Sequence, residues 1–162
     1  MTVSRVGSGS RIVLLNTKTL TGSGAVTFSN IPQQYRKLIL EIINPSADAD
    51  VTLLIRPNNG DSDSNRLVGT TASSFLNDSI QPGTIDATTA DGVIAIEFFN
   101  YSSSTSHKPF MFYGGMEDSS NVDQPIFGGG RYKSNSPITS IEINKVSAFA
   151  LWDGGTANLY GE

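Results

Sequence analysis

The sequence lacks cysteine, and it contains a single histidine, His107, in 162 residues. Without cysteine the chain has no disulfide framework, no thiolate zinc site and no cysteine nucleophile. One histidine excludes a metal site built on two histidines, and it leaves a serine–histidine–acid triad only one possible base. We therefore expect no metal site, no cofactor and no enzymatic activity.

Long hydrophobic runs are also missing. No apolar run approaches the roughly 18 residues that a membrane-spanning helix needs, and residues 1–10 contain no hydrophobic signal region. We expect a soluble protein that is made in a cytoplasm and has no membrane partner.

Acidic residues are absent from the first forty positions. Residues 1–40 hold five of the eleven basic residues and none of the fifteen acidic ones, so residues 41–162 carry a net charge of −9. An acidic body argues against a nucleic-acid partner, which requires a basic face to neutralise phosphates. A basic N-terminal end suits contact with an acidic protein surface, although ordinary solvated charge explains the same pattern.

Helical periodicity is the last absence, since no segment keeps apolar spacing at i, i+3, i+4 and i+7 over three turns. Short strand-like runs, separated by turn-forming residues, recur instead. In Val93-Ile94-Ala95-Ile96-Glu97-Phe98, for example, apolar residues alternate as in a half-buried strand. The predicted strands are residues 11–16, 25–29, 37–43, 51–56, 93–99, 109–113, 137–144 and 156–160.

With no helix available to cover a sheet, the chain must bury its apolar faces in two packed sheets or in a closed barrel. We predict one all-β domain over residues 11–162, a jelly-roll-like antiparallel β-sandwich, preceded by a short extended N-terminal arm at residues 1–10. The ending Leu159-Tyr160-Gly161 indicates a last strand tied into a sheet.

Two stretches are predicted as loops. Residues 114–133 contain five glycines and Pro125, which predicts a long connection with one short strand at Ile126 and Phe127. Residues 57–92 form a second polar stretch, which is broken only by Arg66-Leu67-Val68 and Phe75-Leu76.

No motif selects a catalytic or metal site. The spacing from Asp61 to Asn65 resembles the opening of a calcium loop, but Arg66 replaces the required glycine and Ala72 the required glutamate. Paired carboxylates for glycoside hydrolysis remain open as a third interpretation, because nothing singles out two of the side chains Glu41, Glu97, Glu117 and Glu142.

Surface recognition has three candidate residues. Trp152 precedes the turn-forming Asp153-Gly154-Gly155, so we expect it to be partly exposed. Glu117 and Asp118 make the predicted long connection acidic. Most phenylalanines are expected to fill the core.

From about Lys18 to Gly161, the chain resembles a β-sandwich domain of tailed-bacteriophage virion proteins. The resemblance rests on the order and spacing of short pieces: Gly24-Ala25-Val26-Thr27-Phe28-Ser29-Asn30-Ile31-Pro32 with Tyr35, Leu38-Ile39-Leu40, Asn59-Gly60-Asp61 with Asn65, Phe99-Asn100-Tyr101 with Lys108 and Phe110, Ile138-Thr139-Ser140-Ile141, and Leu159-Tyr160-Gly161. The family that the chain resembles supplies no catalytic residues to carry over.

The resemblance implies a capsid decoration, or cement, protein on the virion surface. Such a protein binds across major capsid subunits and stabilises the shell, commonly as a homotrimer. The expected capsid contacts are Val3, Arg5 and Val6 of the arm, together with Arg11. The alternative is a tail-fibre or tail-tip module that recognises a host-surface glycan through the loops near Trp152 or residues 114–130.

Overall fold

A computed structural model places residues 11–59, 65–68, 74–76, 79–85, 91–117, 123–146 and 150–162. The strands are β1 (Val13–Thr19), β2 (Val26–Phe28), β3 (Lys37–Ala47), β4 (Val51–Pro57), β5 (Asn65–Val68), β6 (Ser74–Leu76), β7 (Thr84–Ile85), β8 (Gly92–Phe99), β9 (Lys108–Glu117), β10 (Asp123–Tyr132), β11 (Ile141–Val146) and β12 (Trp152–Gly161). These residues include no helix, and none that could span a membrane. The arm at residues 1–10 lies outside the described residues.

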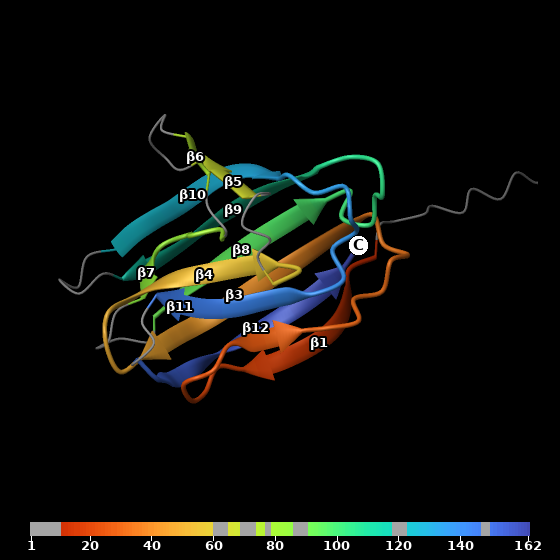
Figure 1. Cartoon of the computed structure of the whole chain (residues 1–162). Helices are drawn as coiled ribbons and strands as arrows, with labels where there is room; N and C mark the ends of the chain where they lie inside the picture. Colours follow the sequence, from red (N-terminus) through yellow and green to blue (C-terminus); the bar gives the residue numbers. More distant parts are fainter. Residues whose placement is uncertain are drawn as a thin grey trace, which may run out of the picture.

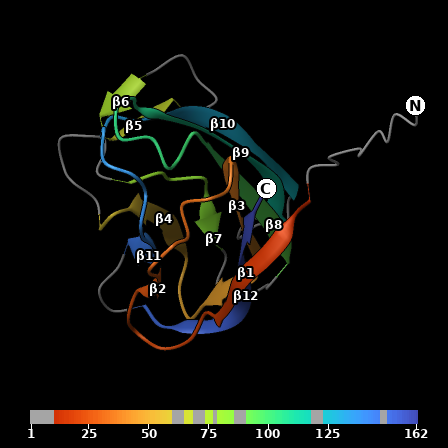
Figure 2. The ribbon, with the colours of Figure 1, turned by 90° about the vertical axis from the view of Figure 1, so that its right-hand side faces the viewer.

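The strands form two antiparallel sheets that pack face to face. The larger sheet has eight strands in the order β1-β12-β3-β8-β9-β10-β5-β6, and the smaller has four in the order β2-β11-β4-β7. In Figure 1 the four-stranded sheet lies in front, and Figure 2 shows the two layers from the side. The predicted all-β sandwich is confirmed.

Apart from β5, β6, β9 and β10, the chain crosses from one sheet to the other at each step except from β4 to β7, which gives the sandwich its jelly-roll order. The larger sheet takes β1, β3, β8 and β12, while the smaller takes β2, β4, β7 and β11. The order β1-β12-β3-β8 facing β2-β11-β4-β7 is that of an eight-stranded jelly roll with two Greek keys. Strands β9, β10, β5 and β6 then extend the larger sheet beyond β8.

One apolar core fills the space between the sheets. In β8, Ile94, Ile96 and Phe98 are fully buried, while Val93 and Glu97 point away from the core. Ile141 and Ile143 of β11 meet this core from the opposite sheet. The alternation that the sequence predicts for these strands is confirmed.

The prediction of a long connection at residues 114–133 is wrong, because residues 114–117 are the end of β9 and residues 123–132 are β10, which pairs with β9 over ten residues. The glycines of this stretch allow neighbouring groups to pack closely against the strands, and they do not mark a flexible loop. A Cβ on Gly128 would lie 2.4 Å from the Phe112 ring, and a Cβ on Gly114 would lie 2.0 Å from the Val93 carbonyl oxygen. Glycine is the residue that leaves room at both positions.

The C-terminal strand lies inside the larger sheet, as predicted. β12 pairs with β1 on one side and with β3 on the other. The backbone N–H of Glu162 donates to the Lys37 carbonyl oxygen at 3.0 Å. The short runs at residues 66–68 and 75–76, which interrupt the second polar stretch, belong to the β5–β6 pair at the far edge of the same sheet.

Two buried polar side chains fasten the loops at one end of the sandwich. The Tyr101 hydroxyl donates to the Pro32 carbonyl oxygen, and the backbone N–H of Ile138 donates to the Tyr101 carbonyl oxygen at 2.8 Å. The Lys108 ammonium is buried and donates to the carbonyl oxygens of Ser106 and Ser134 at 3.0 and 2.8 Å. Burial lowers the pKa of Lys108.

Candidate functional site: the outer face of the eight-stranded sheet

Exposed apolar side chains gather on one surface of the molecule. Eight large hydrophobic residues are exposed within the described ranges, and six of them line the solvent side of the larger sheet: Ile12, Leu14, Val93, Met111, Tyr113 and Phe127. Their exposed fractions run from 41% for Val93 to 60% for Phe127. We call the outward side chains of β1, β12, β3, β8, β9 and β10 the outer face.

The strand register arranges the outer face in rows. One row crosses the sheet through Asn158, Glu41, Ala95, Tyr113 and Phe127, each opposite the next on adjacent strands. Side chains directly opposite one another in an antiparallel sheet are within contact distance. The rows therefore form a continuous surface built from five strands.

The neighbouring row runs parallel to the first, through Tyr160, Ile39, Glu97 and Met111. Glu41 lies between the polar Asn158 and the apolar Ala95, whereas Glu97 lies between two apolar residues, Ile39 and Met111.

A depression of about 300 Å³ opens at the centre of the outer face. Its lining is mostly aliphatic and aromatic: Ile12, Ile39, Glu41, Val93, Ala95, Tyr113 and Tyr160. We call it the Ala95 depression, because the short side chain of Ala95 leaves the space that its taller neighbours enclose. Tyr160 on β12 and Tyr113 on β9 stand three strand spacings apart, about 14 Å across the sheet.

Glu41 is held in the depression by neutral hydrogen-bond donors. The Tyr160 hydroxyl donates to Glu41 Oε2 at 3.0 Å, and Asn158 Nδ2 donates to the same oxygen at 3.3 Å. The Asn158 amide is oriented in turn by the Thr17 hydroxyl, which donates to Asn158 Oδ1 at 2.9 Å. Burial, and then the neighbouring Glu41, raise the pKa of Tyr160.

Glu97 differs from Glu41 because it has a cationic partner. Lys37 Nζ lies 3.0 Å from Glu97 Oε2, and the Tyr113 hydroxyl donates to Glu97 Oε1 at 3.1 Å. Lys37 also pairs with Glu162 at 2.6 Å, and the hydrogen bond to Glu162 is the main cause of the raised pKa of Lys37. In the described part of the chain, no salt bridge joins Glu41.

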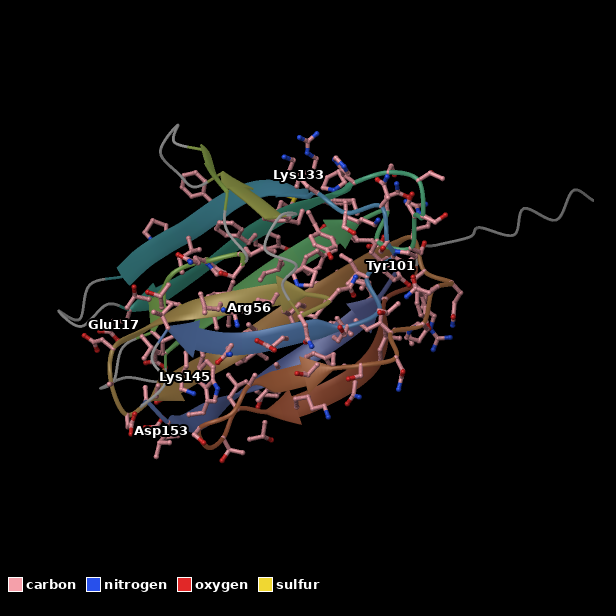
Figure 3. The ribbon with its side chains drawn as sticks, in the orientation of Figure 1. Arg56, Tyr101, Glu117, Lys133, Lys145 and Asp153 are labelled. Atoms are coloured by element: carbon pink, nitrogen blue, oxygen red, sulfur yellow. The ribbon has the colours of Figure 1, made fainter. Side chains whose placement is uncertain are left out.

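A second hollow, of about 510 Å³, lies at the end of the β9–β10 pair. Its lining includes Asp91, Met116, Glu117 and Pro125. Figure 3 shows Glu117 at the opposite end of the sandwich from Tyr101. Asp118, which the sequence groups with Glu117, lies outside the described residues.

The expectation that Trp152 is partly exposed is wrong. Its side chain is 2% exposed and belongs to the core. The Lys145 ammonium lies 4.8 Å from the centre of the Trp152 ring and donates to the Ser23 carbonyl oxygen at 3.2 Å. Trp152 therefore supplies a buried cation–π contact instead of a recognition surface, near the end where Figure 3 shows Lys145 and Asp153.

Of the four predicted capsid contacts, only Arg11 is described. It is exposed and directly precedes Ile12, which lines the Ala95 depression. Val3, Arg5 and Val6 lie outside the described residues, so their role stays a prediction. His107 is half-buried ahead of β9.

The four glutamates of the hydrolase interpretation are spread over the molecule. Glu41 and Glu97 share the outer face, Glu142 pairs with Arg56 on the smaller sheet at 3.2 Å, and Glu117 lies at the end of β9. No group of three or more metal-ligating side chains occurs within the described ranges.

Sequence reasoning missed the outer face as a candidate site. Its signal was present, since Ile39 and Ile43 in β3, and Val93 and Ala95 in β8, occupy positions that face solvent. A strand that is apolar on both faces is typical of burial on both sides. Comparisons with protein families, with curated proteins and with solved structures give no match to this chain.

Proposed function

We propose that the chain is a non-enzymatic virion protein, a capsid decoration protein that binds across major capsid subunits at the capsid surface and stabilises the shell. The resemblance to β-sandwich domains of tailed-bacteriophage virion proteins supports the proposal that the chain is part of a virion. The outer face supports the mode of action, because it offers a rigid, largely apolar contact surface.

The observation that carries the proposal is the clustering of six of the eight exposed large hydrophobic residues on one face. Single exposed apolar residues are normal on a protein surface, whereas a contiguous apolar patch marks an interaction site. The patch lies on paired strands, so little conformational entropy is lost when a partner covers it.

Stabilisation of the shell would follow from mass action. A protein that binds assembled subunits and not free ones shifts the equilibrium towards the assembled state, by an amount set by its affinity and its concentration. No catalytic group is needed for this role.

Cryo-electron microscopy of virions that contain the chain tests the proposal directly. Copies distributed over the shell at three-fold or quasi-three-fold positions support decoration, and copies confined to the tail contradict it. The proposed homotrimer is tested separately, by the mass of the purified protein in analytical ultracentrifugation.

The proposed contact surfaces are tested with matched variants in a sedimentation assay on shells that lack the protein. Phe127→Asp should abolish binding, because it places a charge on the apolar outer face. Val146→Asp is the control, since Val146 is 53% exposed on the smaller sheet. Deletion of residues 2–10 should also remove binding if the arm is a grip, while leaving the thermal unfolding of the sandwich unchanged.

A tail-fibre or tail-tip module that recognises a host-surface glycan is the second candidate. The two tyrosines beside Glu41 in the Ala95 depression favour it, because aromatic faces and carboxylates are groups that contact sugar rings and hydroxyls. This version does not use Trp152, which is buried. Binding on a glycan array that is lost in Tyr113→Ala would support it.

A further inference from the structure

Glu41 and Glu97 on the outer face differ in their partners. Glu97 has Lys37 as a cationic partner, and Lys37 also pairs with Glu162. Glu41 forms no salt bridge within the described residues, and the two groups that hold it, Tyr160 and Asn158, are neutral. Among the residues that line the depression Glu41 alone is charged, so the depression is an apolar site with a carboxylate in its wall.

A partner that covers this face must compensate the negative charge of Glu41. Closing an apolar surface over a carboxylate removes water, and a buried charge without an opposite charge is costly. A cation placed against Glu41 offsets this cost, because the two form a charge-assisted hydrogen bond, which is stronger than a neutral one. Tyr113 and Tyr160 add aromatic rings beside the same space, which favour a cation further.

The rest of the lining specifies what surrounds the cation. Ile12, Ile39 and Val93 offer aliphatic surface on the sides of the depression, and Met111 and Phe127 extend it over β9 and β10. An apolar side chain of the partner fits there, whereas a partner with a second carboxylate would be repelled by Glu41. Arginine fits best, because its planar guanidinium can pair with a carboxylate and stack on a ring.

We propose that the Ala95 depression is the docking site for an arginine or lysine side chain, flanked by apolar residues, on a segment of the partner protein. The inference rests on the proposed decoration function, in which the partner is the major capsid protein. In this inference the depression recognises the basic side chain of the partner through its charge complementarity with Glu41.

The first experiment measures binding to undecorated shells at several salt concentrations. Glu41→Gln keeps the size of the side chain and removes its charge, so it should weaken binding by about tenfold or more and flatten the salt dependence. Glu142→Gln is the matched control on the smaller sheet and should bind as the unmodified protein does. Ala95→Arg should abolish binding, because it fills the depression and supplies Glu41 with a cation from the same chain.

The second experiment applies the same proteins to an array of hexapeptides, which separates the two proposals. Selective binding to peptides that carry arginine or lysine beside leucine or phenylalanine, lost in Glu41→Gln, supports the inference even if the shells are not bound. Shell binding that Glu41→Gln leaves unchanged overturns the inference and leaves decoration standing. Peptide binding without a basic preference, or glycan binding that Ala95→Arg removes, also overturns it.

Discussion

Replacement of Gly114 by alanine should strongly destabilise the sandwich. Gly114 lies in β9 opposite Ile94 of β8. A Cβ at this position would lie 2.0 Å from the Val93 carbonyl oxygen and 3.0 Å from Ile94 Cα, and real Cβ atoms essentially never come closer than 3.0 Å. The two strands would have to separate by about 1 Å at that point to admit the methyl group.

The cost follows from what blocks the methyl group. Both neighbours are backbone atoms in a paired strand, so neither can rotate aside as a side chain can. Overpacking a well-packed site costs about 1–3 kcal/mol, and we expect the upper end here. For a chain of this length, about 3 kcal/mol corresponds to a Tm lower by about 6–12 °C.

Thermal unfolding followed by circular dichroism and by Trp152 fluorescence measures the effect, since Trp152 is buried and reports on the core. Gly24→Ala is the control, because no heavy atom lies within 4 Å of the Cβ that it would add. That variant should be neutral, or more stable by about 0.4–1 kcal/mol through a less flexible unfolded chain. A Tm for Gly114→Ala within about 1 °C of the control would refute the close approach of β8 and β9.

Further predictions concern the loops that Tyr101 and Lys108 fasten. Tyr101→Phe removes the hydrogen bond to the Pro32 carbonyl oxygen and should lower the free energy of unfolding in urea by about 1–2 kcal/mol. Tyr113→Phe is the control at a site 44% exposed and should lower it by less than about 0.5 kcal/mol. Equal losses in the two variants would contradict this reasoning. Burial lowers the pKa of Lys108 below 10.5, so the unfolded state binds more protons as the pH approaches 10.5 and stability should rise with pH. The Tm of the unmodified protein should therefore increase relative to that of Lys108→Met between pH 7 and pH 9.5, and parallel profiles would show that Lys108 does not titrate differently on folding.

Period-2 alternation made most of the fold predictable. In β8 and β11 the buried residues fall at every second position, as the sequence indicates. The alternation predicts which side chains meet in the core, and the absence of helices leaves a sandwich as one of the two ways to bury them. Strand ends were less predictable: β3 continues to Ala47, past the turn-like Asn44 and Pro45.

The β9–β10 pair could not be predicted because its glycines have two physical explanations. Consecutive glycines such as Gly128, Gly129 and Gly130 are typical of loops, since they are conformationally free. They are equally required where an aromatic ring packs onto a strand, as Phe112 does at Gly128. Only the partner across the sheet distinguishes the two cases, and the sequence does not name that partner.

The candidate site was hidden for a related reason. Glu41 and Glu97 were named among the possible paired carboxylates, and both face outward on neighbouring strands. Their grouping with Tyr113 and Tyr160 depends on the order β12-β3-β8-β9, which brings together residues far apart in the chain. Trp152 was misplaced because its neighbours Asp153 and Gly154 indicate a turn, whereas β12 begins at Trp152 itself.

The outer face is complete only when β12 is in place. Two of the groups around Glu41, Asn158 and Tyr160, belong to β12, which is inserted between β1 and β3. Without β12, β1 has no partner in the larger sheet, and Glu41 is not held by these donors. A copy in which β12 is not docked therefore lacks the complete depression, so only the finished sandwich presents the outer face in full.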